Sequence, residues 1–340
     1  MKKAYVFLSL MAVLAMVLTA CGTAATPTPA VTVIRETAVP PTAVPPTEAP
    51  TVNPLGTADK PIIVAFEPSG TSTEITAGGQ ELLALLSTET GLTFKGVIPN
   101  SYAALTEAMG SGNAQIGWMA TFAYILAKQK GFADAALITV RFGSDHYGSQ
   151  FIANVKSGFT PAADKPGTEA ELKSTLEQFK GKKACFGDPE STSGYVVPMI
   201  FLKNAGLTDA DIPNPVFTGG HTQTVQAIYD TGICDYGATF VDARGNIAKT
   251  SPDVNDKVVV IYQTQPIIPN DNMYYAPDMP QNLRDKVTLA MLKIAGTADG
   301  KKALNDLYQI SGLTVVDDTA YDQFRSYLTT AGIDLSQYVK

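Results

Sequence analysis

Short apolar runs alternate with amphipathic segments along the chain from residue 57 onward. The run 62–66 predicts a buried strand that ends in the Pro-Ser-Gly turn at 68–70, and the leucines within 82–86 predict a helix after it. Alternating strands and helices with short turns are typical of an α/β sheet with parallel strands. The same alternation continues, with strands predicted at 93–97, 114–118 and 136–140 and helices at 102–109 and 122–130.

A second series of the same kind begins after the apolar run 150–155. Two similar halves predict two lobes, and open α/β sheets bind ligands at the carboxyl ends of their strands, in a cleft between the lobes. The second series has strands predicted at 183–186, 215–217, 235–240 and 258–262, an extended piece at 272–275, and helices at 193–205, 222–229, 281–295, 297–310 and 319–331. We therefore predict an α/β fold of two mainly parallel, helix-flanked sheets, with lobe 1 at 57–150 plus 264–340 and lobe 2 at 151–263.

The first 20 residues have the pattern of a secretory signal peptide: two lysines, an apolar run at 4–18 and small residues before a cut. This run is shorter than the roughly 20 apolar residues of a transmembrane helix. The sequence Leu-Thr-Ala-Cys at 18–21 resembles the lipobox of bacterial lipoproteins, which implies a lipid on Cys21. The alternative is an ordinary signal peptide followed by a chance cysteine. We expect a protein of the cell envelope, anchored by Cys21 on the extracytoplasmic side of a membrane.

Residues 21–56 are rich in threonine and proline and have almost no aromatic residues. Proline fixes φ and lacks a backbone donor, so this segment is predicted to be an extended linker and not part of a core. The net charge of −7, from 25 basic and 32 acidic residues, argues against a nucleic-acid partner. Besides Cys21 the chain has Cys185 and Cys234, which are either a disulfide or two buried thiols. Their spacing suggests no metal site, and we expect neither metal nor cofactor.

The segment 187–195 holds the sharpest local motif, because it follows a predicted strand and opens a predicted helix. Its Ser191, Thr192 and Ser193 can present hydroxyls and main-chain N–H groups at a helix N-terminus, where unpaired donors and the helix dipole favour an anion. The alternative is that one of the three is only an N-cap.

His221 stands in a similar place, after the strand 215–217 and at the start of the next helix. Its ring can donate to an oxyanion, more strongly when protonated. A lone histidine is equally compatible with a structural role. His146, the other histidine, ranks lower as a residue at the edge of the cleft.

These residues, together with the Ile-Pro-Asn-Asp stretch at 268–271, resemble the phosphonate-, phosphite- and phosphate-binding proteins of ABC transporters over nearly all of 57–340. The resemblance implies a type II periplasmic-binding-protein fold whose lobes close on an oxyanion. It implies that Ser191, Thr192 and Ser193 hold the phosphoryl oxygens with His221 beside them. It further implies that Asp271 accepts a hydrogen bond from a protonated oxygen or an amine, and that Asp242 faces a ligand amine.

One departure from the family pattern follows Trp118, which the resemblance places in the site. Family members often carry a tyrosine just after this tryptophan, whereas this chain has Met-Ala-Thr at 119–121. Thr121, Tyr124 or Tyr147 is left to supply the missing hydroxyl.

We therefore expect a monomeric solute-binding lipoprotein that captures a small anionic ligand, a phosphorus oxyanion, and presents it to the permease of an ABC importer. The alternatives are a binder of a sulfonate or another organic anion and a ligand-sensing lipoprotein. A hydrolase or transferase is disfavoured, because the chain has only two histidines and neither a Gly-x-Ser-x-Gly nor a His-Glu-x-x-His motif. No catalytic residue is predicted.

Overall fold

The computed structural model describes residues 55–338, which belong to one compact unit of the chain. The predicted signal peptide, Cys21 and the predicted linker up to residue 54 lie outside the described residues. Leu55, which we predict to lie in the linker and outside any core, is instead buried in a hydrophobic core. Within 55–338 no helix combines the length and the apolar character needed to cross a membrane.

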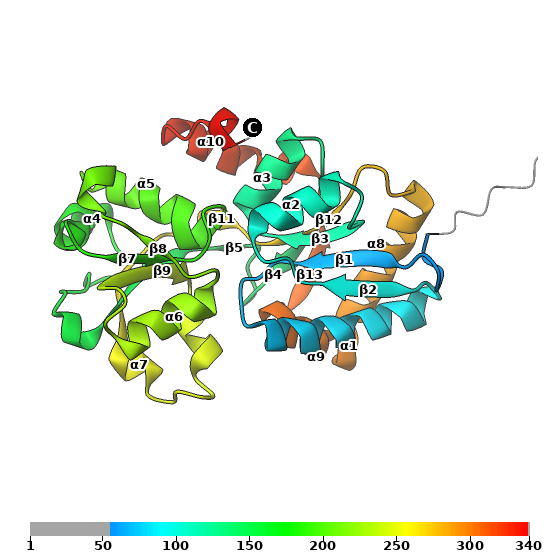
Figure 1. The fold of residues 1–340 in the computed structure, drawn as a ribbon, viewed down its shortest axis with the longest axis horizontal. Coiled ribbons are helices and arrows are strands. Elements are labelled where there is room, and N and C mark those ends of the chain that lie inside the picture. The colour runs from blue at the N-terminus through cyan, green and yellow to red at the C-terminus, as the bar shows by residue number, and fades with distance from the viewer. Residues whose placement is uncertain (1–54, 339–340) are drawn as a thin grey trace, which may run out of the picture. The chain divides into compact units, whose positions relative to one another are not determined.

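A six-stranded sheet forms the first lobe, in the order β13-β4-β12-β3-β1-β2. Helices cover both of its faces: one core joins the sheet to α1, α8 and α9, and another joins it to α2, α3 and α10 (Figure 1). The strands are β1 (Ile62–Phe66), β2 (Phe94–Val97), β3 (Ile116–Met119), β4 (Asp134–Val140), β12 (Asn272–Tyr275) and β13 (Gly312–Val315). The helices are α1 (Ser72–Thr90), α2 (Tyr102–Gly110), α3 (Thr121–Gln129), α8 (Gln281–Ala295), α9 (Ala298–Tyr308) and α10 (Asp322–Thr330).

A five-stranded sheet forms the second lobe, in the order β10-β6-β9-β7-β8. One core joins it to α4 and α5, and a second core on the other face joins it to α6 and α7. The strands are β6 (Ser149–Asn154), β7 (Ala184–Phe186), β8 (Val216–Phe217), β9 (Tyr236–Phe240) and β10 (Val258–Gln263). The helices are α4 (Glu169–Leu176), α5 (Val197–Asn204), α6 (His221–Asp230) and α7 (Val254–Lys257).

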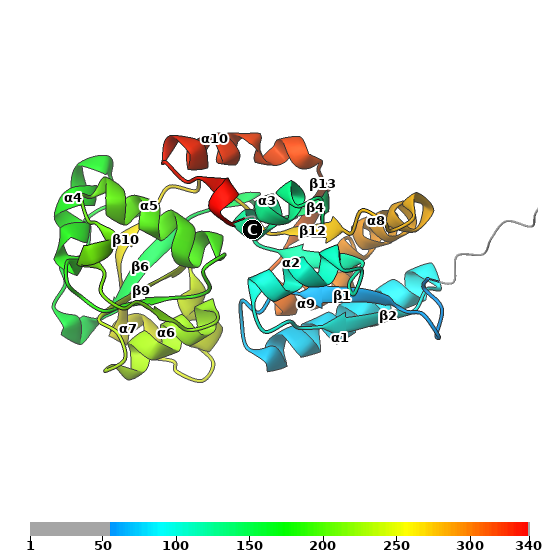
Figure 2. The same cartoon turned by 45° about the horizontal axis from the view of Figure 1, so that its top comes forward.

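The chain crosses between the lobes twice, through β5 (His146–Tyr147) and β11 (Ile268–Pro269), which pair with each other antiparallel. Figure 2 shows α10 lying along α3, near α5. The core that holds α10 includes Val197 and Ile200 of α5 as well as side chains of α3, so the C-terminal helix shares a hydrophobic core with elements of both lobes.

The two-lobed α/β architecture is as predicted, but both sheets are mixed. β12 lies antiparallel between β3 and β4, and β6 lies antiparallel between β9 and β10. Each of these strands comes directly from a crossing segment and enters its sheet from the opposite end, which accounts for the reversed direction. The predicted lobe limits at 150/151 and 263/264 stay a prediction; β6 begins at Ser149 and β10 ends at Gln263.

Candidate functional site

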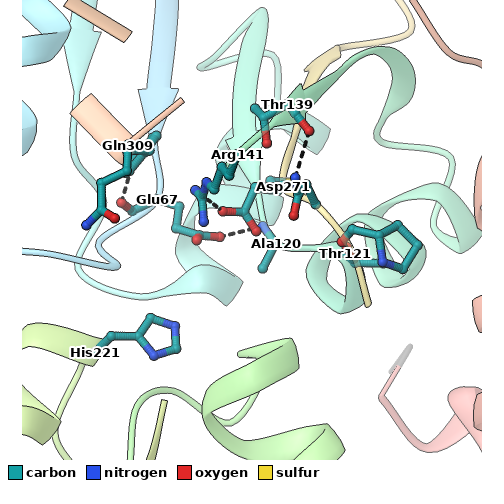
Figure 3. A network of polar contacts seen from close by, with 12 residues as sticks. Glu67, Ala120, Thr121, Thr139, Arg141, His221, Asp271 and Gln309 are labelled. Atoms are coloured by element: carbon teal, nitrogen blue, oxygen red, sulfur yellow. Dashed lines mark hydrogen bonds and ion pairs between the residues drawn. The ribbon is translucent and has the colours of Figure 1, made fainter. Parts of the chain in front are cut away.

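A cavity of about 500 Å³ is lined by residues of both lobes. On the first-lobe side Glu67 follows β1 and Arg141 follows β4, whereas Ser193 follows β7 and His221 opens α6 on the second-lobe side. Open α/β sheets bind ligands at this end of their strands. Figure 3 shows His221 facing the first-lobe group that contains Glu67, Arg141 and Asp271. The cavity is therefore the candidate ligand site.

Ser193 and His221 bring buried polar atoms to the cavity. Oγ of Ser193 and Nδ1 of His221 have no hydrogen-bond partner within the described residues, although the two residues are only 1% and 4% exposed. The other ring nitrogen of His221, Nε2, lies 3.4 Å from Oγ of Ser191, which accepts a hydrogen bond from the N–H of Gly194 at 3.1 Å. Buried polar atoms are almost always paired, so these two are available for a ligand.

Gly194 allows the close contact between the His221 ring and the side chain of Ser191. A Cβ at this position would lie 2.8 Å from Oγ of Ser191, closer than real contacts of a Cβ, and 3.1 Å from Cε1 of His221, which is tighter than most. The glycine after the Ser-Thr-Ser run therefore lets the His221 ring approach the loop.

The ring of His221 is neutral at physiological pH. Burial, and secondarily the positive charge of Arg141, lowers the pKa of His221 to about 3. The protonated form, for which we predict stronger donation, is therefore not the form that the free protein holds at this pH. A neutral imidazole has one donor and one acceptor nitrogen, so His221 can offer a ligand one hydrogen bond of either kind through Nδ1.

Arg141 and Asp271 form an ion pair at the first-lobe wall of the cavity. An Nη of Arg141 lies 2.6 Å from Oδ2 of Asp271, and both side chains are about nine-tenths buried. Nε of Arg141 is buried without a partner among the described residues. Burial raises the pKa of Asp271, and Arg141 offsets part of that rise. Arg141 thus neutralises Asp271 and still has a donor to spare.

Glu67 places a second carboxyl group in the same cavity. Its Oε2 accepts a hydrogen bond from the N–H of Ala120 at 2.5 Å, and the residue is 4% exposed. Burial raises the pKa of Glu67 well above its usual range, and the negative charge of Asp271 adds to this rise. The cavity therefore combines one guanidinium with two carboxyl groups, of which Asp271 is paired with Arg141 and Glu67 is not.

Four of the predicted ligand-binding residues line the cavity, namely Ser193, His221, Asp271 and Tyr147. Ser191 lies behind Ser193 and contacts the ring of His221. The structure thus brings together residues from four separate segments of the sequence.

Three other predicted residues lie away from the cavity. Trp118 is buried in the first-lobe core, Thr121 donates its hydroxyl to the carbonyl of Pro269 at 2.5 Å, and the hydroxyl oxygen of Thr192 accepts a hydrogen bond from the N–H of Phe122 at 2.8 Å. None of the three lines the cavity. Because side chains alternate along β3, Trp118 faces the core formed with α1 and α8.

Asp242 is engaged by its own neighbours instead of facing the cavity. Its carboxylate accepts hydrogen bonds from Nε and an Nη of Arg244, the shorter at 2.6 Å, and from the amide of Gln150 at 2.9 Å. These partners lower the pKa of Asp242 although burial opposes the shift. Asp242 is also absent from the cavity lining, so the structure does not place it where a ligand amine would be held.

Sequence reasoning missed Glu67, Arg141 and Tyr308. The first two follow directly after predicted strands, the position that singled out the loop at 187–195, and this was the available signal. Tyr308 lines the cavity from α9 and donates its hydroxyl to the main-chain carbonyl of Glu67 at 2.8 Å. Nothing in the pattern around Tyr308 pointed to it, because it lies at the end of an ordinary amphipathic helix.

A disulfide joins β7 to the segment before β9 in the second lobe. Cys185 of β7 and Cys234, which precedes β9, are joined with an S–S distance of 2.06 Å. β7 leads into the loop that carries Ser193, so the bond ties this loop's base to the neighbouring strand. The described residues contain no group of three or more His, Cys, Asp or Glu side chains placed to hold a metal ion.

Residues 64–321 match the model of a family described as ABC transporter, phosphonate, periplasmic substrate-binding protein. The chain belongs to this family. The resemblance seen in the sequence is thereby confirmed, and so is the prediction of a binding protein and not an enzyme, because the family consists of substrate-binding proteins.

Two curated relatives of the family match part of the chain. The phosphate-import protein PhnD of Mycolicibacterium smegmatis is 32% identical over 189 residues, which cover 53% of this chain and 54% of that protein. The phosphonates-binding periplasmic protein of Escherichia coli is 23% identical over 209 residues, which cover 61% of this chain and 58% of that protein. The chain thus spans little more than half the length of these relatives.

Solved structures confirm the fold as that of type II periplasmic binding proteins. PhnD1 of Prochlorococcus marinus in complex with methylphosphonate has a TM-score of 0.70 at 16% identity, with 80% of this chain and 98% of that chain covered. A binding-protein component of an ABC phosphonate transporter from Pseudomonas aeruginosa has a TM-score of 0.67 at 21% identity, with 82% and 95% covered.

Proposed function

We propose that this protein captures a small phosphorus oxyanion in the cavity between its lobes and presents it to an ABC importer. Three buried polar atoms support the proposal: Oγ of Ser193, Nδ1 of His221 and Nε of Arg141, which lack partners among the described residues. They come from both lobes and belong to residues that line one cavity, so an oxyanion can satisfy them together only when the lobes are closed around it.

The relatives agree with this choice of ligand. The Mycolicibacterium smegmatis protein is named for phosphate import, and the Prochlorococcus marinus protein was solved with methylphosphonate. The residues proposed to contact the ligand are Ser193, His221, Arg141, Asp271 and Tyr147, with Ser191 orienting the His221 ring and Thr192 joining the lobes.

We further propose that a lipid anchor and a linker keep the ligand-loaded protein near the permease. Cys21 carries the lipid that holds the protein at the outer side of a membrane, and residues 21–56 form the linker. A lipid anchor keeps the binding lobes near the permease, which raises the local concentration of the loaded form. The protein acts as a monomer, and the lobes are divided at 150/151 and 263/264.

Calorimetric titration of the full chain, purified in detergent, tests the ligand class. Phosphate, phosphite, methylphosphonate and 2-aminoethylphosphonate form the panel, with sulfate and methanesulfonate as controls. We expect at least one phosphorus oxyanion to bind far more tightly than the sulfur compounds. Tighter binding of a sulfonate, or millimolar binding of every phosphorus compound, contradicts the proposal.

Ser193→Ala tests the site. Loss of a buried hydrogen-bonding group costs the bound state roughly 1–3 kcal/mol, an affinity loss of about 5- to 150-fold. Ser111→Ala is the matched control, because that hydroxyl is exposed and lies outside the cavity lining. Unchanged affinity in Ser193→Ala would remove Ser193 from the site.

A further inference from the structure

Glu67 is a buried carboxyl group whose neighbours do not neutralise it. Arg141 pairs with Asp271 at 2.6 Å, so the one guanidinium among the buried lining residues is already engaged. The only hydrogen bond to the Glu67 carboxyl within the described residues is the one from the N–H of Ala120 at 2.5 Å. An ionised Glu67 would therefore give this part of the cavity a net negative charge and repel an incoming anion.

Within the part of the chain that the structure describes, the groups around Glu67 offer no further cation to pair with it. Asp271 and Arg141 face it from the first-lobe wall, and Asp188 approaches from the loop after β7. His221, across the cavity, is neutral because burial lowers its pKa to about 3. Lys302 lines the cavity too, but it is paired with Glu81 and Asp306, and Lys249 is exposed. Three tyrosines complete the surroundings, Tyr102, Tyr147 and Tyr308, whose phenols are uncharged.

We propose that Glu67 is a specificity-determining residue that accepts the ligand only in its neutral form, so that the oxyanion and a proton on Glu67 bind together. This inference rests on the proposed function, and it names the charge state that the site selects. With Oε2 engaged by Ala120, the proton sits on Oε1 and can be donated to a ligand oxygen. Asp271, whose carboxylate is paired with Arg141, accepts a hydrogen bond from a ligand hydroxyl.

Such a site selects a singly charged oxyanion that carries a hydroxyl group. A fully ionised anion such as sulfate has no proton to give to Asp271, and its second charge is repelled by that carboxylate. A singly charged phosphonate or phosphate satisfies both carboxyl groups, because it accepts from Glu67 and donates to Asp271.

The pH dependence follows from the same charges. A bound anion adds negative charge beside Glu67 and raises the pKa of its carboxyl group further. The affinity for the ligand is therefore highest below the pKa of Glu67 in the free protein. It falls as the pH rises through this pKa, by up to about tenfold per pH unit. The fall ends at the higher pKa of the bound state.

Glu67→Gln provides the test, because the amide keeps the shape and the hydrogen bonds of a neutral carboxyl group and cannot ionise. Titrations of the full chain with methylphosphonate and with phosphate, from pH 6 to 9.5, compare this variant with the wild type. We expect Glu67→Gln to bind at pH 6 within a factor of about 5 of the wild type and to lose affinity less steeply as the pH rises. Both proteins see the same titration of the ligand, so the difference in slope belongs to Glu67.

Proton uptake gives a second readout that needs no variant. Titrations of the wild type in buffers of different ionisation enthalpy count the protons taken up, and subtracting the ligand's own protonation leaves the share of Glu67. We expect an uptake that approaches one proton as the pH passes the pKa of free Glu67. No uptake across the whole range, or equal pH profiles for wild type and Glu67→Gln, overturns the inference and leaves the proposed function standing. If no phosphorus oxyanion binds the wild type at any pH, the proposed function itself fails.

Discussion

The hydroxyl oxygen of Thr192 accepts a hydrogen bond from the main-chain N–H of Phe122 at 2.8 Å. Thr192 begins the helical turn Thr192–Val196 that leads into α5 in the second lobe, whereas Phe122 lies in the first turn of α3 in the first lobe. The first N–H groups of a helix lack partners within it, and α3 begins after Ala120, which has no capping side chain. The second lobe thus supplies a cap that the first lobe lacks. A hydroxyl that we predicted to hold the ligand instead joins the lobes.

Thr192→Val should weaken ligand binding without removing a ligand contact. Valine has the shape of threonine but no acceptor, so the buried N–H of Phe122 loses its partner in the closed form, at a cost of roughly 1–3 kcal/mol. The lobes then close less readily. The binding free energy, obtained from the dissociation constant that calorimetry measures, becomes weaker by the same amount. Thr192→Ser keeps the oxygen and serves as the control. Wild-type affinity in Thr192→Val would show that this bond does not contribute to closure.

Asp242→Asn should leave the choice of ligand unchanged. Asp242 is held by Arg244 and Gln150 and is absent from the cavity lining, so it has no free carboxylate for a ligand amine. We expect the ratio of affinities for 2-aminoethylphosphonate and methylphosphonate to stay as in the wild type. Folding stability should fall by about 1 kcal/mol, the size expected for a partly exposed pair with hydrogen bonds. A selective loss of the aminoalkyl ligand would return Asp242 to the site.

Removing the Cys185–Cys234 disulfide should destabilise the protein. The cysteines are 49 residues apart, and a cross-link of that length restricts the unfolded chain, which contributes roughly 2–4 kcal/mol. Urea denaturation of the Cys185→Ser/Cys234→Ser double variant measures the loss, and reduction of the wild type by dithiothreitol is the control. An assay of the unfolded, unreduced protein that finds both thiols free would contradict the bond.

Buried strands were the part of the fold most accessible to sequence reasoning. The strand 62–66 is buried on both faces, so its apolar run stands out, and it became β1 with the predicted limits. β13 (Gly312–Val315) was missed because it is an edge strand with exposed residues and no continuous apolar run. α4 (Glu169–Leu176) was missed although Thr168 and Glu171 form a capping box at its start, since only two of its residues are buried.

The site could be predicted where a motif coincides with a strand end, and not where a partner elsewhere in the chain decides a role. Ser193 and His221 were found in this way, and both line the cavity. The engagement of Thr192 depends on Phe122, which is 70 residues away, and that of Asp271 depends on Arg141, which is 130 residues away. Only the folded chain brings such pairs together, so sequence reasoning assigned both residues to the ligand and missed their protein partners.

His221 should remain uncharged in the folded protein well below pH 6. Burial, and then the charge of Arg141, lowers the pKa of His221 from 6.5 to about 3, so between these values the unfolded chain binds a proton that the folded chain does not. The protonation of His221 in the unfolded chain therefore does not affect stability above pH 6.5. As the pH falls below 6.5, it favours unfolding and raises the unfolding equilibrium constant by up to about tenfold per pH unit. Urea unfolding at pH 4.5–7.5 of the wild type and of His221→Gln isolates this term, because the carboxyl groups titrate in both proteins. Nitrogen chemical shifts of the His221 ring give a direct measure, and a ring that is protonated by pH 5.5 in the folded protein would contradict the burial argument.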